Sequence, residues 1–91
     1  MDNKWLDNRW YFRDFYIPGY MRQRLLDYIE KRVPPGGFLE KVICNDLMGA
    51  LSAADSLNMG NLPAYGNFLY NYAPCSCYGS VEKYHKWIKG E

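Results

Sequence analysis

The sequence predicts a mostly α-helical protein, a small four-helix domain preceded by an aromatic-rich extended N-terminal arm. Two observations carry this prediction. From about residue 18 onward, apolar residues recur at the three- and four-residue spacing of amphipathic helices. Prolines and glycines divide this part of the chain into four such stretches, and the clearest boundary is the Pro-Pro-Gly-Gly sequence at residues 34–37. We expect one domain over residues 1–91, with the arm at 1–17 and a helical core at 18–91.

Composition is typical of a folded domain. Of the 91 residues, 48% are hydrophobic and 18% are aromatic, and the net charge is +1. The apolar runs are too short to cross a membrane, and the first residues lack the pattern of a signal peptide. We therefore expect a cytoplasmic location and no membrane partner. No basic stripe predicts binding to duplex nucleic acid.

The arm contains six aromatic residues with arginines and aspartates between them. Its period fits either a strand or an irregular segment, because Trp10 and Phe12 alternate with Tyr11 and Arg13. We expect its rings to pack across the helices, as additional core for a small domain rather than as a platform that stacks nucleobases.

The first helix is expected to begin at Pro18, since proline is tolerated in a first turn. Its core side chains share helical spacing: Met21, Leu25, Tyr28 and Ile29. Arg22 and Arg32 project within or beside this apolar arc. Such arginines usually lay their stems along the core and extend the charged group to solvent, but a buried charge partner is the alternative.

A second, continuous helix is expected over residues 38–54, with Asp46 near the middle of its apolar face. An unpaired carboxylate there would be costly. We expect Asp46 to be buried and paired with Arg22 or Arg32, or with backbone amides. Capping or anchoring a loop is favoured for Asp46, and ligand binding is the alternative.

Residues 55–61 are expected to form a turn-rich connection. A third helix then opens at Pro63 and stops before Pro74, and Ser80 is expected to cap a fourth. The third helix has apolar residues at i, i+3, i+4 and i+7: Tyr65, Phe68, Leu69 and Tyr72.

Residues 56–80 carry no charged side chain, which is unusual for plain solvated surface. Interface cores are depleted in charge and enriched in aromatic residues and methionine. We therefore predict a homo-oligomer, in its simplest form a symmetric dimer, with Tyr70, Asn67 and Asn71 facing outward. The alternative is that this segment is simply buried.

Catalytic and metal chemistry is not indicated. The sequence has three cysteines and one histidine, too few for a typical tetrahedral zinc site. It lacks a phosphate-binding Walker A loop and an identifiable nucleophile–base pair. We expect no enzyme activity, no metal and no cofactor.

The glycine-rich turn suggests a ligand. Backbone amides at a helix N-terminus attract anions, so a phosphate-bearing molecule is expected near Gly36, Gly37 and Phe38. Arg22 or Arg32 is expected to close over it. The set of candidate ligand-binding residues is completed by three polar or aromatic positions: Asn45, Asp46 and Tyr70.

Spaced motifs run through about four-fifths of the chain: Ile17-Pro18, Leu25, Tyr28, the PPGGFL sequence at 34–39, Asn45-Asp46-Leu47, Ala54-Asp55, Leu62-Pro63, Leu69-Tyr70, Ala73-Pro74, Gly79-Ser80, Lys83 and Trp87. In these motifs the chain resembles a family of small uncharacterised phage and prophage proteins. The resemblance implies a viral protein in the host cytoplasm and brings no functional residues. Small phage accessory proteins commonly bind host proteins or sequester nucleotide signals of bacterial defence.

The sequence therefore favours a non-enzymatic phage accessory protein that sequesters a nucleotide-type immune signal of the host. The alternative is an inhibitor that binds a host protein directly.

Overall fold

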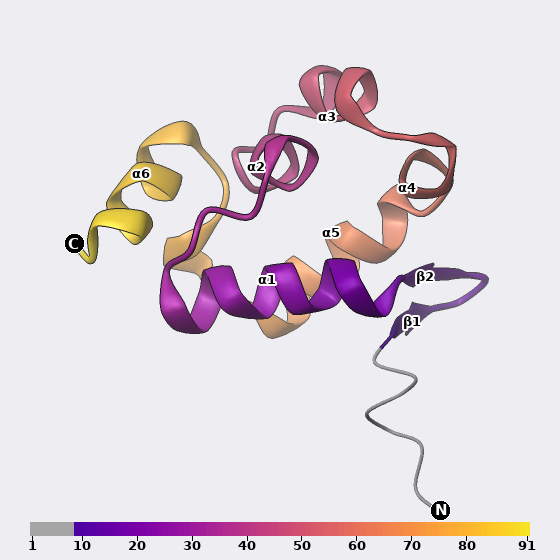
Figure 1. Ribbon diagram of the computed structural model, residues 1–91, viewed down its shortest axis with the longest axis horizontal. Coiled ribbons are helices and arrows are strands. Elements are labelled where there is room, and N and C mark those ends of the chain that lie inside the picture. The colour runs from indigo at the N-terminus through magenta and orange to yellow at the C-terminus, as the bar shows by residue number, and fades with distance from the viewer. Residues whose placement is uncertain (1–8) are drawn as a thin grey trace, which may run out of the picture.

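The structure, a computed structural model, describes residues 9–91, which form six α-helices, a short 3-10 helix and a two-stranded hairpin (Figure 1). The first eight residues of the expected arm lie outside the described part. The elements are β1 (Trp10–Phe12), β2 (Phe15–Ile17), α1 (Gly19–Lys31), α2 (Gly37–Ile43), α3 (Leu47–Ala53), α4 (Ser56–Gly60), α5 (Leu62–Tyr72), η1 (Cys75–Cys77) and α6 (Val81–Lys89).

Residues 10–17 form an antiparallel hairpin in which Trp10 lies opposite Ile17 and Phe12 opposite Phe15. The turn between the strands uses Arg13 in the left-handed region, at φ 56°. Positive φ values in a two-residue turn match the twist of the flanking strands. The part of the arm that the structure describes is thus a strand pair, which was one of the two alternatives left open by its period.

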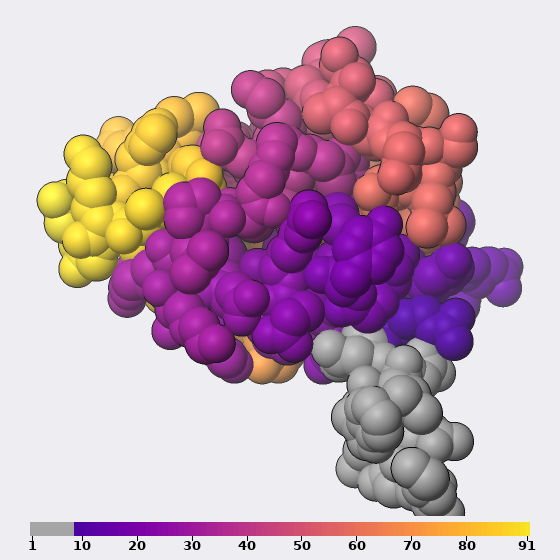
Figure 2. All heavy atoms as spheres, viewed as in Figure 1, coloured from indigo at the N-terminus to yellow at the C-terminus, as the bar shows by residue number. Residues whose placement is uncertain are grey.

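α1 presents Met21, Leu25 and Tyr28 to the core, as the apolar spacing predicted. The helix ends where Arg32 adopts a left-handed conformation at φ 60° and donates its backbone N–H to Tyr28. Two prolines follow, and Gly36 enters α2 at φ 103°, a conformation that favours glycine. In the space-filling view, α1 covers the middle of the visible face, between α6 and the hairpin (Figure 2).

The prediction of one continuous helix over residues 38–54 is wrong, because the chain breaks between α2 and α3. Asn45 adopts a left-handed conformation at φ 63°. Asp46 donates its N–H to the Lys41 carbonyl, and its side chain accepts the N–H of Gly49 at 2.9 Å. Asp46 is therefore the N-cap of a new helix, a role in which aspartate is strongly preferred.

Residues 55–61 also differ from prediction. Instead of a turn-rich connection, they contain the short helix α4, which begins where the Asp55 side chain accepts the N–H of Asn58 at 2.8 Å. These two changes replace the four predicted helices by six, while the mostly helical class is confirmed.

The last two helices follow the prediction closely. α5 begins with Pro63 near its first position, and Ser80 caps α6 by accepting the N–H of Lys83. The core joins side chains from β2 and every helix except α4: Ile17, Met21, Leu25, Tyr28, Phe38, Leu39, Ile43, Ala50, Ala64, Tyr65, Phe68, Leu69, Cys77 and Tyr84. Among residues 9–91, no helix has both the length and the apolar character needed to cross a membrane.

Candidate functional site

A groove of about 530 Å³ lies where α2 and α3 face α5. Its walls are mostly apolar and come from three separate parts of the chain. The lining residues are Val42, Asn45, Asp46, Leu47, Ala50, Leu62, Pro63, Gly66, Leu69, Tyr70, Tyr78 and Gly79. We call this hollow the α3–α5 groove.

Three of the predicted ligand-binding residues meet in this groove: Asn45, Asp46 and Tyr70. The first two are there because the helix breaks at them, so the α2–α3 junction supplies a polar corner to an otherwise apolar wall. Tyr70 projects from α5 and is 80% exposed, which places an aromatic ring at the rim. Tyr78, which sequence analysis did not single out as a ligand-binding residue, adds a second aromatic side chain.

The Asp46 carboxylate was predicted to pair with an arginine or with backbone amides, and in the structure its partner is a backbone amide. It is half-buried, and it accepts a hydrogen bond from the Gly49 amide rather than from an arginine. The side chain lies directly over Gly49, so that a Cβ at that position would overlap the carboxylate. The absence of a side chain at Gly49 therefore lets Asp46 fold back onto its own helix.

One end of the groove is tied to the C-terminal part of the chain. Gly79 donates its N–H to the Ile43 carbonyl at 2.7 Å and adopts φ 115°. The Lys83 ammonium donates to the Cys75 carbonyl at 3.3 Å and lies 3.8 Å from the position that a Cβ on Gly79 would occupy. An exposed cation therefore stands next to a residue that lines the groove.

The Pro-Pro-Gly-Gly turn lies outside the α3–α5 groove. Gly36 lines a separate shallow hollow of about 310 Å³ with Arg24, Asp27 and residues 33–35. The Arg24 guanidinium comes within 3.6 Å of the position of a Cβ on Gly36. Arg24 was not among the predicted ligand-binding residues, since helical spacing alone does not reveal where the loop after α1 returns.

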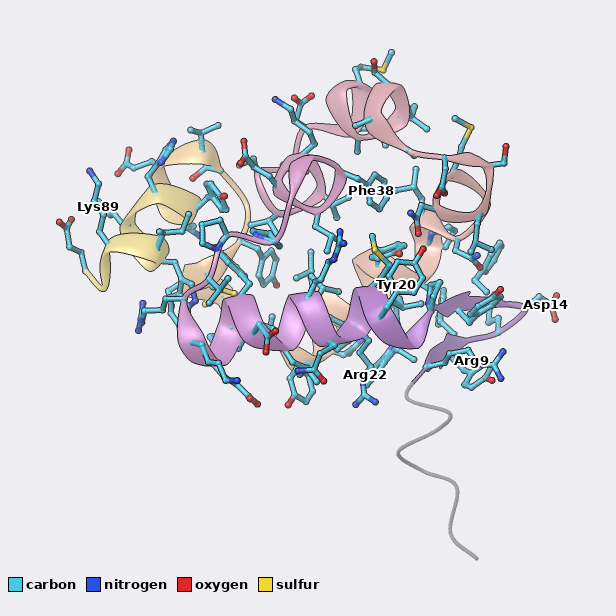
Figure 3. All side chains as sticks on the ribbon, viewed as in Figure 1. Arg9, Asp14, Tyr20, Arg22, Phe38 and Lys89 are labelled. Atoms are coloured by element: carbon cyan, nitrogen blue, oxygen red, sulfur yellow. The ribbon has the colours of Figure 1, made fainter. Side chains whose placement is uncertain are left out.

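The remaining predicted residues are held elsewhere. Arg22 points to the opposite side of α1 from Phe38 (Figure 3), and its guanidinium lies 5.8 Å from the Trp10 ring centre. Arg32 donates to the Trp87 carbonyl at 2.8 Å and stacks over the Trp87 ring at 3.9 Å. Phe38 is buried and packs edge-to-face with Tyr65. Gly37 is exposed. The expected phosphate site at the turn is therefore not assembled from Arg22 or Arg32.

Among the described residues, four of the five groups with raised pKa values belong to the core, and the fifth, the Cys44 thiol, is half-buried against it. Burial raises the pKa of Tyr84 to about 12 and the pKa of Cys77 to about 11, and it raises the pKa values of Tyr28 and Tyr65 further. Their hydroxyls have structural partners: Tyr28 donates to the Cys77 carbonyl and Tyr65 to the Asn58 side chain, both at 2.6 Å. None of these groups lines the α3–α5 groove. Within residues 9–91, no three metal-ligating side chains gather.

Comparison with known proteins finds no matching family model, no similar curated protein and no similar solved structure. The resemblance to phage proteins stays a prediction, and the α3–α5 groove is the feature of the described residues that points to a function.

Proposed function

We propose that this protein acts by binding rather than by catalysis and that the α3–α5 groove is its binding site. The observation that carries the proposal is the groove itself. Sites for small molecules commonly have volumes of about 300–1,000 Å³, mainly apolar walls and a few convergent polar groups. The groove, at about 530 Å³ and with Asn45 and Asp46 at one corner, has these properties.

The ligand class that we propose is a nucleotide-type signal, which the protein sequesters as a phage accessory protein in the host cytoplasm. Tyr70 and Tyr78 offer faces on which a base can stack, and the Asn45 amide offers hydrogen bonds to a base edge. Lys83 supplies a positive charge at the Gly79 end for a phosphate. Retaining such a ligand requires no catalytic group.

Titration calorimetry with a panel of cyclic and linear nucleotides tests this role. Stacking of one base on an aromatic side chain is worth about 1–3 kcal/mol, so Tyr70→Ala is expected to weaken binding by about 5- to 150-fold. Tyr20→Ala is the matched control, because Tyr20 is also exposed but lies on α1, outside the groove. If no nucleotide produces a binding isotherm, the nucleotide role is abandoned.

Direct inhibition of a host protein is the second candidate, and a specific observation favours it. Leu47 and Met48 are exposed at the start of α3, and Leu47 lines the groove. Exposed apolar side chains beside a groove are common at protein interfaces. Retention of one host protein by the wild type but not by Met48→Glu, together with no nucleotide binding, selects this candidate.

The homo-oligomer expected from the uncharged segment also belongs to this proposal.

A further inference from the structure

The α5 wall of the groove is open at one residue, Gly66. Pro63, Gly66 and Tyr70 all line the groove, and their spacing of three and four residues places them on one face of the helix. A Cβ added to Gly66 would meet no side chain and no other segment within 4 Å. The missing side chain between a proline ring and a tyrosine ring therefore leaves room in which a planar ring can lie against the helix.

The opposite wall supplies one carboxylate. Asp46 is half-buried, and among the described residues that line the groove it is the one with a charged side chain. Its Oδ1 accepts the Gly49 N–H at 2.9 Å, whereas the two oxygens of a carboxylate together can accept about four hydrogen bonds. Asp46 therefore has acceptor capacity left for a ligand that brings N–H donors.

The edges of the nucleobases differ in the donors that they can bring. Guanine has two adjacent donors, N1–H and the 2-amino group, beside the O6 acceptor. Adenine and cytosine have an amino group next to a ring nitrogen that only accepts, and uracil has one N–H between two carbonyls. An ionised carboxylate only accepts, so it forms two parallel charge-assisted hydrogen bonds with guanine alone among these four bases.

We propose that the α3–α5 groove selects guanine, with the purine ring over Gly66 beside Tyr70 and the Asp46 carboxylate accepting N1–H and the 2-amino group. This inference rests on the nucleotide role proposed above and names the base. Asn45 precedes Asp46 and also lines the groove, and its amide NH2 can donate to O6. The polar corner of the groove thus offers acceptors and a donor in the combination that a guanine edge requires.

Titration calorimetry on the full chain tests the choice of base. The probes are the 5′-monophosphates and the 3′,5′-cyclic monophosphates of guanosine, inosine, adenosine and xanthosine, so that the base changes while the phosphate stays the same. A bidentate contact to a base discriminates by about 5- to 150-fold, which is the preference expected for guanine over adenine. Inosine lacks the 2-amino group and is expected to bind between the two.

Asp46→Asn separates base recognition from folding, because asparagine is an equally good N-cap but replaces one of the two acceptors with a donor. Xanthine has a carbonyl where guanine has its 2-amino group. The variant is therefore expected to prefer xanthine over guanine by about 5- to 150-fold. Asp55→Asn is the matched control, because Asp55 caps α4 by accepting the Asn58 N–H and does not line the groove. It is expected to keep the guanine preference.

A second variant tests where the ring lies. Gly66→Leu fills the open place on α5 and is expected to weaken the binding of every nucleotide by at least about 10-fold, while urea denaturation shows no loss of stability. Gly60→Leu makes the same change at a glycine of α4 where an added Cβ also meets nothing within 4 Å. Because Gly60 does not line the groove, its substitution is expected to leave binding unchanged.

The outcomes separate this inference from the proposed function. Nucleotide binding without a preference for guanine overturns the inference and leaves the nucleotide role standing. A guanine preference that survives in Asp46→Asn also overturns it, because another group must then read the base. Binding of no nucleotide by the wild type overturns both. A guanine preference that changes to xanthine in Asp46→Asn but not in Asp55→Asn supports both.

Discussion

Gly49 shows how one missing side chain decides the local structure of the groove wall. Its Cα lies beneath the Asp46 carboxylate, and the Lys41 Cδ lies 3.0 Å from where a Cβ would be. Alanine in an exposed helix is normally more stable than glycine by up to about 1 kcal/mol. At this position the usual preference is expected to reverse, because the added methyl group displaces the capping carboxylate.

The test at this scale compares two glycines. Gly49→Ala is expected to lower the free energy of unfolding by about 1 kcal/mol through loss of the cap. Gly66→Ala on α5, where an added Cβ meets nothing within 4 Å, is expected to raise it by about 0.5–1 kcal/mol. Asp46→Ala should cost about as much as Gly49→Ala, and Asp46→Asn less, because asparagine is an equally good cap. Urea denaturation measures all four. Equal stabilisation by Gly49→Ala and Gly66→Ala would contradict the conclusion that Gly49 makes room for the Asp46 cap.

The break at Asn45 and Asp46 also shows how far the sequence predicts the elements. Apolar spacing carries straight through residues 38–54, since Val42, Ile43, Leu47 and Ala50 keep helical phase across the break. The signal that was available is chemical: Asn tolerates positive φ, and Asp before an apolar run is a common N-cap. Periodicity reports which face is buried, whereas caps report where a helix begins and ends.

Two asparagines form hydrogen bonds between the hairpin and the helices. Asn61 is 6% exposed, and its side chain accepts the Tyr16 N–H at 2.8 Å and donates to the Leu57 carbonyl at 2.9 Å. Asn67 accepts the Trp10 indole N–H at 2.9 Å. Asn67 was expected to face outward, but it is partly buried by this contact. The hairpin, the junction between α4 and α5 and the core are thus connected by side chains that the spacing of apolar residues does not identify.

Asn61→Ala is expected to lower the free energy of unfolding by about 1–3 kcal/mol, because it leaves a partly buried donor and acceptor without their partner. In the same variant, hydrogen exchange at the Tyr16 amide should be faster, because this amide loses its acceptor. Asn71→Ala on the exposed side of α5 is the control and is expected to change stability by no more than about 0.5 kcal/mol. Unchanged Tyr16 exchange in Asn61→Ala would show that the hairpin is held by its rings alone.

At the scale of the whole molecule, the core depends on several hydroxyl and thiol groups that must stay protonated. The pKa of Tyr84 rises from 10.0 to about 12 through burial and its hydrogen bond to Glu40, and that of Cys77 rises from 9.0 to about 11 through burial. A raised pKa in the folded state stabilises the protein fully below the unfolded pKa, and this contribution is lost as pH rises toward the folded pKa.

The free energy of unfolding is therefore expected to be level up to about pH 9 and to fall between pH 9 and 12. Tyr84→Phe should flatten the part of the fall between pH 10 and 12, since phenylalanine has no proton to lose. Tyr20→Phe, at an exposed position on α1, should leave the profile unchanged. Denaturant titrations across this range give the profile, and a fall of equal slope in Tyr84→Phe would contradict the role given to Tyr84.

Only part of the candidate site could be predicted from the sequence, because some of its contacts join segments that are far apart in the chain. Residues close in sequence, such as Asn45 and Asp46, stay together in any fold, and Tyr70 was found through the uncharged segment. Arg22 and Arg32 were assigned to the glycine turn from their angle on α1 alone. The hairpin and α6 then provided Trp10 and Trp87 as their contacts. Contacts between distant segments depend on the path of the chain, which helical spacing does not contain.

The three-segment origin of the α3–α5 groove has a thermodynamic consequence. Its lining comes from residues 42–50, 62–70 and 78–79, so the unfolded chain contains no version of the site. Any molecule that occupies the groove binds the folded state alone and must shift the folding equilibrium, by about 2.7 kcal/mol at a free concentration 100 times its Kd. A rise in the melting temperature of this protein therefore reports that a molecule binds the groove, even when the chemical identity of that molecule is not known.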